Sequence, residues 1–131
     1  AWVKDLNRLY KSEPALHEKD FSADGFEWID ISDSEKSIIS FLRKGKGAND
    51  LILIVCNLTP VPQYNYRIGV PRRGFWKEIL NSDAKTYGGT GHGNFGAVEA
   101  MPVNAQGRDL SVSLTLPPLS ILFFKSMGET L

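Results

Sequence analysis

The residues most suggestive of chemistry are Gly91-His92-Gly93-Asn94-Phe95-Gly96, which match a dinucleotide-binding loop and, with Ala97-Val98, a kinase glycine-rich loop. A dinucleotide loop needs a helix directly after it, because the helix N-terminus then meets the pyrophosphate. Pro102 follows too soon for that helix, and no kinase Val-Ala-Ile-Lys or Asp-Phe-Gly segment follows. We therefore interpret residues 81–96 as a long, mobile connection between strands.

Other reactive side chains do not form a recognisable set. His17 and His92 lack neighbouring ligands for a metal, and Cys56 lies in an apolar run without a group that would lower its pKa. The carboxylates between residues 20 and 35 fall near predicted turns, where such residues usually form solvated loops: Asp20, Asp24, Glu27, Asp30, Asp33 and Glu35. We predict no catalytic residue, no metal site and no cofactor in this chain.

Aromatic residues offer a different chemistry, because a flat ring with polar neighbours can stack on a sugar. Trp28 lies between Glu27 and Asp30, and Tyr87 precedes two glycines. Packing in a core or an interface is the alternative for each ring. We favour the core for Trp76, which has Phe75 directly before it and Ile79 three residues after it.

Composition narrows the classes of partner. The 131 residues carry 15 basic and 15 acidic side chains, and the absence of a basic block argues against nucleic acid. No apolar window is long enough to cross a bilayer, and the single cysteine suits a reducing compartment. We therefore expect a cytoplasmic protein with no membrane partner.

The elements that must position these residues are mainly strands. Residues 51–59 form the longest apolar run, with Leu51, Leu53 and Val55 on one face and Ile52, Ile54 and Cys56 on the other. One face is expected to pack on a second sheet, and the other on a part of the protein outside this chain. Eight runs read as strands: residues 26–31, 37–44, 51–59, 66–70, 75–80, 97–101, 111–116 and 120–125.

The spacing of these runs predicts a mainly β, antiparallel two-sheet sandwich. In residues 111–116, alternation places Val112, Leu114 and Leu116 inward. Residues 1–12 instead have the helical period, with Trp2, Leu6, Leu9 and Tyr10 on one side. The chain begins inside this pattern without a capping residue, so we expect a piece of a longer protein.

Several short segments, in their order and spacing, closely resemble the carboxy-terminal part of the bacterial 1,4-α-glucan branching enzymes, a branch of the α-amylase family. They are Asp5-Leu6-Asn7-Arg8-Leu9-Tyr10, Pro14-Ala15-Leu16-His17-Glu18, Gly25-Phe26-Glu27-Trp28-Ile29-Asp30, Asn57-Leu58-Thr59-Pro60-Val61-Pro62, Tyr66-Arg67-Ile68-Gly69-Val70-Pro71 and Asn81-Ser82-Asp83 before Tyr87-Gly88-Gly89. The resemblance covers essentially the whole chain.

The resemblance implies that residues 1–20 are the last helical segment of a (β/α)₈ barrel and that residues 21–131 form the carboxy-terminal sandwich. The family's catalytic carboxylates lie on the barrel, so the fragment alone is expected to be inactive. The parent enzyme would transfer α-1,4 glucan chains to 6-hydroxyls by retaining chemistry, making the α-1,6 branches of glycogen.

The resemblance further implies an α-glucan partner, glycogen or maltooligosaccharide, for which Trp28, Asp30 and Tyr87 are the contact candidates in this chain. Trp2, Leu6 and Leu9 are the candidates for docking on the barrel, which would leave an apolar stripe exposed in the isolated chain. The main alternative is a stand-alone carbohydrate-binding sandwich with Trp28 as its platform.

Overall fold

The computed structural model describes residues 2–16, 25–30, 37–47, 50–82, 94 and 96–128. A helix, α1 (Trp2–Ser12), leads into a 3₁₀ turn, η1 (Pro14–Leu16), and strands follow. The strands are β1 (Phe26–Asp30), β2 (Ile38–Lys44), β3 (Leu51–Asn57), β4 (Gln63–Val70), β5 (Gly74–Asn81), β6 (Ala97–Ala100), β7 (Leu110–Leu116) and β8 (Ser120–Gly128). Each of the eight predicted runs is a strand, with ends shifted by a few residues.

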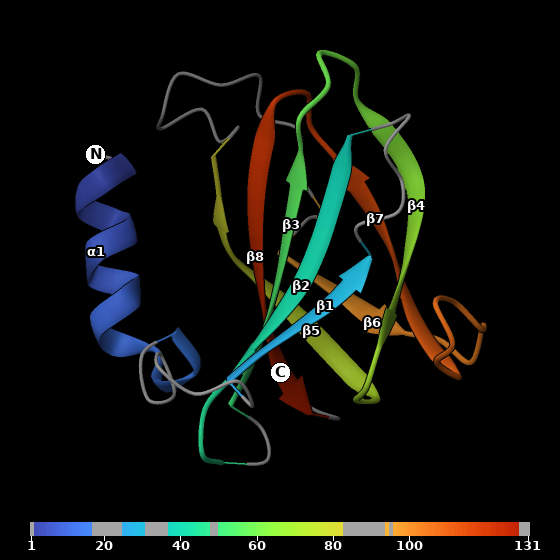
Figure 1. The fold of residues 1–131 in the computed structure, drawn as a ribbon, viewed down its shortest axis with the longest axis horizontal. Helices are drawn as coiled ribbons and strands as arrows, with labels where there is room; N and C mark the ends of the chain where they lie inside the picture. The colour runs from blue at the N-terminus through green and yellow to red at the C-terminus, as the bar shows by residue number, and fades with distance from the viewer. Residues whose placement is uncertain are drawn as a thin grey trace.

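The strands form two antiparallel sheets. Six of them pair in the order β1-β2-β3-β8-β5-β6, and β4 pairs with β7 in a second sheet. Figure 1 shows α1 beside one face of the six-stranded sheet and the β4–β7 pair beside the other. The prediction of a mainly β two-sheet sandwich with an amino-terminal helix is confirmed.

β3 lies in the middle of the larger sheet and has two apolar faces, as its sequence predicted. Leu53 and Val55 are fully buried in the core between the sheets, together with Leu51. Ile52 and Ile54 point the other way into a second apolar group, which we call the outer cluster. Its other buried members are Ala15, Leu16, Leu80 and Phe123. Strand geometry separates the two rows because successive side chains alternate in direction.

The core between the sheets is built from aromatic and branched side chains. Trp76 and Phe124 are its largest fully buried members, and the predicted core position of Trp76 is confirmed. The indole N–H of Trp76 donates to the carbonyl of Arg72 at 3.2 Å, which satisfies its one polar group. On β7 the inward side chains are Val112, Leu114 and Leu116, again as predicted.

The outer cluster is covered by the amino-terminal segment of the same chain. Ala15 and Leu16 of η1 are buried in this cluster, where η1 contacts β2 and β3, and α1 packs alongside through Trp2, Leu6 and Leu9. The Arg43 guanidinium donates to the carbonyl of Leu16 at 3.2 Å, and Glu13 pairs with Lys125 of β8 at 2.9 Å. The second face of β3 was expected to pack on a part of the protein outside this chain. It is instead covered, at least in part, by the amino-terminal residues of this chain.

Candidate functional site

Trp28 lies on β1, which is an edge strand of the six-stranded sheet in the described part of the chain. It stands opposite Phe41 of β2, and the two rings meet edge to face, with centroids 5.6 Å apart and planes inclined by 70°. Phe41 in turn packs against the outer cluster, so the ring that contacts the indole is held in place by the packing of the domain. Trp28 nevertheless remains 51% exposed. A supported, half-open indole of this kind can present apolar surface to a sugar ring.

Glu27 extends from the same strand toward the opposite face and joins an ionic group. Its carboxylate accepts hydrogen bonds from Lys44 of β2, at 2.5 Å, and from Arg108 in the β6–β7 connection. The hydrogen bond from Lys44 and the positive charges of both partners lower the pKa of Glu27, although partial burial opposes this. The group ties the edge strand to a distant loop and holds the carboxylate ionised.

Of the three predicted glucan-contact residues, the structure describes the side chain of Trp28 alone. Asp30 ends β1 after a register shift that begins at Trp28, but its side chain lies outside the described part of the structure. Tyr87 lies outside the described residues altogether, as do His17 and His92. Their roles stay predictions.

Trp2, Leu6 and Leu9, predicted to dock on a barrel, are half-buried against the outer cluster of this chain's own sheet. The expectation that these three residues are left exposed in the isolated chain is therefore wrong. Tyr10, which was predicted to lie on the same side of the helix, is 45% exposed. The sheet's outer face is itself apolar, and burying two apolar surfaces against each other removes both from water. Contact of these residues with a barrel stays a prediction.

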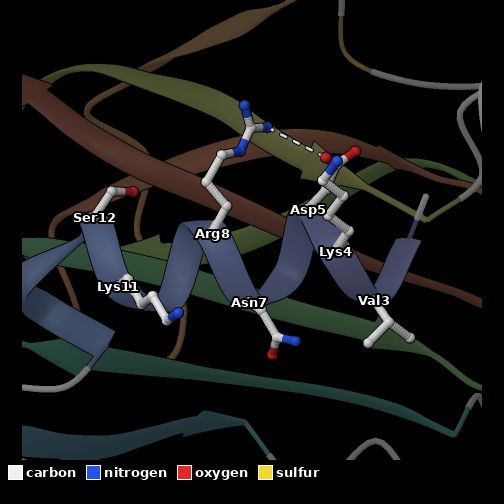
Figure 2. Close-up of a pocket in the computed structure, with 7 residues that line it drawn as sticks. All are labelled: Val3, Lys4, Asp5, Asn7, Arg8, Lys11 and Ser12. Atoms are coloured by element: carbon white, nitrogen blue, oxygen red, sulfur yellow. Dashed lines mark hydrogen bonds and ion pairs between the residues drawn. The ribbon is translucent and has the colours of Figure 1, made fainter.

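A surface hollow runs along α1, and its described lining comes from that helix alone: Val3, Lys4, Asp5, Asn7, Arg8, Lys11 and Ser12. Figure 2 shows Arg8 reaching toward Asp5, one turn away, at 3.4 Å. Because no described side chain of another element converges on this hollow, it lacks the enclosed arrangement of polar groups that defines a small-molecule site.

Among the described residues there is no activated nucleophile, no metal-binding cluster and no membrane-spanning helix. Cys56 is half-buried on the outer face, and desolvation raises the pKa of its thiol, which disfavours the reactive thiolate. Within the described ranges, no three His, Cys, Asp or Glu side chains gather where a metal ion could be held. No helix in those ranges is both long enough and apolar enough to span a membrane.

Two partners at the β1 edge were not anticipated from the sequence. Phe41, which supports Trp28, could have been found only by assuming the correct register of the hairpin formed by β1 and β2. Arg108 is 81 residues from Glu27, and no local pattern links them.

Comparison with known proteins gives the family. Residues 28–126 match the model of the alpha amylase C-terminal all-beta domain. The 1,4-alpha-glucan branching enzyme GlgB of Aquifex aeolicus is 59% identical over 96% of this chain and 20% of its own length. The enzyme of the same name from Aromatoleum aromaticum is 58% identical over 93% of this chain and 19% of its own length.

The chain thus spans about a fifth of the length of these curated relatives, and the resemblance first drawn from its short segments is confirmed. The family match covers residues 28–126 and agrees with the two-sheet architecture. The chain belongs to the family of alpha-amylase C-terminal all-beta domains.

Proposed function

We propose that this chain is the carboxy-terminal domain of a 1,4-α-glucan branching enzyme, which moves α-1,4 glucan chains to 6-hydroxyls and so makes the α-1,6 branches of glycogen. The observation that carries the proposal is 58–59% identity, over 93–96% of the chain, to two proteins bearing that name. The catalytic carboxylates would lie elsewhere in the parent polypeptide, and the retaining transfer would take place there.

Within that enzyme, residues 1–20 would be the last segment of the catalytic barrel and residues 21–131 the sandwich. The amphipathic helix α1 would lie between the two bodies. Its packing on the outer cluster through Trp2, Leu6 and Leu9 supports a connecting role, and its half-buried apolar residues retain surface for the barrel. We further propose a cytoplasmic location, in keeping with the single unpaired cysteine.

The test is a chimera. The equivalent segment of the Aquifex aeolicus relative is replaced by residues 1–131, and α-1,6 linkages formed from amylose are measured. We expect branching comparable to that of the unmodified relative, whereas a version lacking the segment should lose activity or stability. A chimera that is folded and monodisperse but forms no α-1,6 linkages would contradict the proposal. The chain alone is expected to form none.

Direct contact with α-glucan is the second role we propose, and the exposure of Trp28 above its Phe41 support favours it. Asp30 and Tyr87 remain candidates to assist. If the sandwich were a stand-alone carbohydrate-binding module, it would bind maltoheptaose without any other domain. Calorimetry on the isolated chain and on the parent enzyme separates these cases, because a supporting domain needs no affinity of its own.

A further inference from the structure

The smaller sheet consists of β4 and β7 and, within the described residues, has no third strand beside either of them. Figure 1 shows this pair on the side of the larger sheet that faces away from α1. The edge strands of the larger sheet, β1 and β6, have only five and four residues, whereas β4 has eight and β7 has seven. A long edge strand presents a row of backbone N–H and C=O groups with which a strand of another molecule can pair. In the smaller sheet, side chains close both edges.

The sequences of these two strands suit pairing with a further strand. Residues 110–116, Leu-Ser-Val-Ser-Leu-Thr-Leu, contain no charged residue, no proline and no glycine. In β4, Arg67 is the one charged residue. Short segments with high β-propensity and little charge are the ones that pair readily between molecules. An open edge on either strand would therefore attract a second copy of this chain.

The side-chain amide of Gln106 covers the outer edge of β4. Its carbonyl oxygen accepts from the backbone N–H of Gly69 at 2.5 Å, and its NH₂ group donates to the carbonyl of Arg67 at 3.4 Å. Backbone groups of residues two apart point to the same side of a strand, so a strand added at this edge would bond to these same groups. The amide of Gln106 thus occupies the place that a backbone peptide of another strand would take.

The turn that carries Gln106 is shaped to reach this edge. Ala105 and Arg108 bond to each other through both backbone groups, at 2.9 and 3.0 Å, and close a two-residue turn. Its central residues, Gln106 and Gly107, have φ of +45° and +76°, a conformation for which asparagine and glycine are preferred. Glutamine brings no advantage to this backbone, so its use here lies in the longer side chain. On β4, Gly69 leaves room for the turn, because a Cβ there would collide with the carbonyl of Ala105.

The side-chain amide of Asn94 covers the edge of β7 in a similar way. Its carbonyl oxygen accepts from the backbone N–H of Thr115 at 2.7 Å, and its NH₂ group donates to the carbonyl of the same residue at 3.0 Å. The NH₂ group also donates to the Glu78 carboxylate of β5 at 2.9 Å, which ties the two sheets together. Near the other end of β7, the backbone of Met101 bonds to both backbone groups of Ser111. The β7 edge is therefore closed near both of its ends.

We propose that the amides of Gln106 and Asn94 are caps that keep β4 and β7 from pairing with a second copy of this chain. A side-chain amide suits this role because it carries a donor and an acceptor, as a backbone peptide does, but cannot continue the sheet. Without it, the backbone groups of the edge must bond to water or to another strand. The fold thus contains a surface for pairing between copies, and two side chains hold it closed.

Hydrogen exchange read by mass spectrometry in the full-length protein tests the caps. Gln106→Gly removes the amide and keeps a residue that suits the left-handed turn, so the fold should be retained by circular dichroism. The N–H of Gly69 should then exchange about fivefold faster or more, as for the loss of one hydrogen bond, while that of Thr115 should not change. Asn94→Ala should give the reverse pattern, so each variant is the control of the other.

Sedimentation velocity of the same proteins tests the consequence. Gln106→Gly, alone and combined with Asn94→Ala, should form larger assemblies than the unmodified protein as the concentration is raised. Asn104→Gly is the matched control, because it removes an exposed amide from the same β6–β7 connection, and it should behave like the unmodified protein. In the assemblies the released N–H groups should exchange slowly again, because the backbone of a second copy would accept from them.

The measurements separate the ways in which the caps could fail. Slow exchange at Gly69 in Gln106→Gly and at Thr115 in Asn94→Ala would show that the amides do not close the edges. Fast exchange without more association than in Asn104→Gly would show that the open edges do not attract a second copy. Association in which the released N–H groups stay fast would place the contact on another surface. Each of these results would overturn the proposal, and Gln106→Gly alone decides if Asn94→Ala does not fold.

Discussion

Trp28 and Phe41 face each other across the β1–β2 pair with their rings nearly perpendicular, 5.6 Å between centroids. Edge-to-face pairs of this kind are favourable and set the direction of both rings. Phe41 is anchored in the outer cluster, so the orientation of the exposed indole is fixed by the packing of the domain. A fixed aromatic surface binds with less loss of side-chain entropy than a mobile one.

Trp28→Ala is expected to weaken the binding of maltoheptaose to the parent enzyme by about 1 kcal/mol, or about fivefold in Kd, because it removes the stacking surface. Calorimetry gives the Kd directly. Met101→Ala is the control, since Met101 is also a large apolar residue, 48% exposed, but directly follows β6, the strand at the opposite edge of the six-stranded sheet. An unchanged Kd in Trp28→Ala would remove Trp28 from the candidates for glucan contact.

Asn57→Ala is expected to lower the free energy of unfolding by about 2–4 kcal/mol, since it removes the buried amide that donates to the carbonyls of Val61 and Pro117 and so frees the β3–β4 turn. The carbonyl of Pro117 keeps one donor, the hydroxyl of Ser120 at 2.6 Å. Urea-induced unfolding measures the change. Thr59→Ala removes the hydrogen bond that its hydroxyl donates to the same amide, at a more exposed position, and should cost about 1 kcal/mol. Equal costs for the two variants would mean that the amide is not the centre of the turn.

Local patterns in the sequence were enough to predict the strands and the faces of the buried ones. Period-2 alternation identified the inward row of β7, and the unbroken apolar run identified β3 as covered on both sides. The order of strands could not be predicted, because β8 lies between β3 and β5 through contacts between segments that are far apart in sequence. Register and sheet order depend on such contacts, which leave no periodic signal.

For the candidate site too, the sequence predicted individual residues but not the residues that they contact. Trp28 was recognisable as an aromatic residue between acidic neighbours, but its support by Phe41 depends on register. For α1 the apolar stripe was correctly predicted, yet its observed partner is the sheet of this chain. Amphipathicity states which face of a helix is buried and carries no information about which surface buries it.

Gly69→Ala tests how closely the β6–β7 connection lies on β4. A Cβ at residue 69 would fall 2.2 Å from the carbonyl oxygen of Ala105, a backbone atom that cannot simply rotate away. We expect a loss of about 2–3 kcal/mol in the free energy of unfolding, from the forced shift of the connection. Differential scanning calorimetry or urea unfolding would measure it.

Gly107→Ala is the control for Gly69→Ala. Its Cβ would meet nothing within 4 Å, so the only expected cost is the left-handed φ of +76°, about 1 kcal/mol. If Gly69→Ala were as well tolerated as Gly107→Ala, the connection would not be held against β4 as closely as the structure has it.

The ionic group of Glu27, Lys44 and Arg108 predicts a pH-dependent stability. The hydrogen bond from Lys44 and the two positive charges hold the folded-state pKa of Glu27 below its ordinary value of 4.5. A lowered pKa stabilises the fold at pH values above the unfolded-state pKa, and this stabilisation is lost as the pH falls through 4.5 and below. The carboxylate then takes up a proton and no longer attracts the two cations.

Glu27→Gln should therefore lower the free energy of unfolding by about 0.5–1 kcal/mol near neutral pH, the range of a partly exposed ion pair. At about pH 3, below the ordinary pKa of 4.5, the ionised carboxylate contributes less to the stability of the fold, so the difference from the variant should be smaller. Urea unfolding at both pH values measures this. Glu99→Gln, at an exposed position on β6, should show no comparable change. A Glu27→Gln difference that is equal at both pH values would show that the charge of Glu27 contributes nothing to holding β1 against the β6–β7 connection.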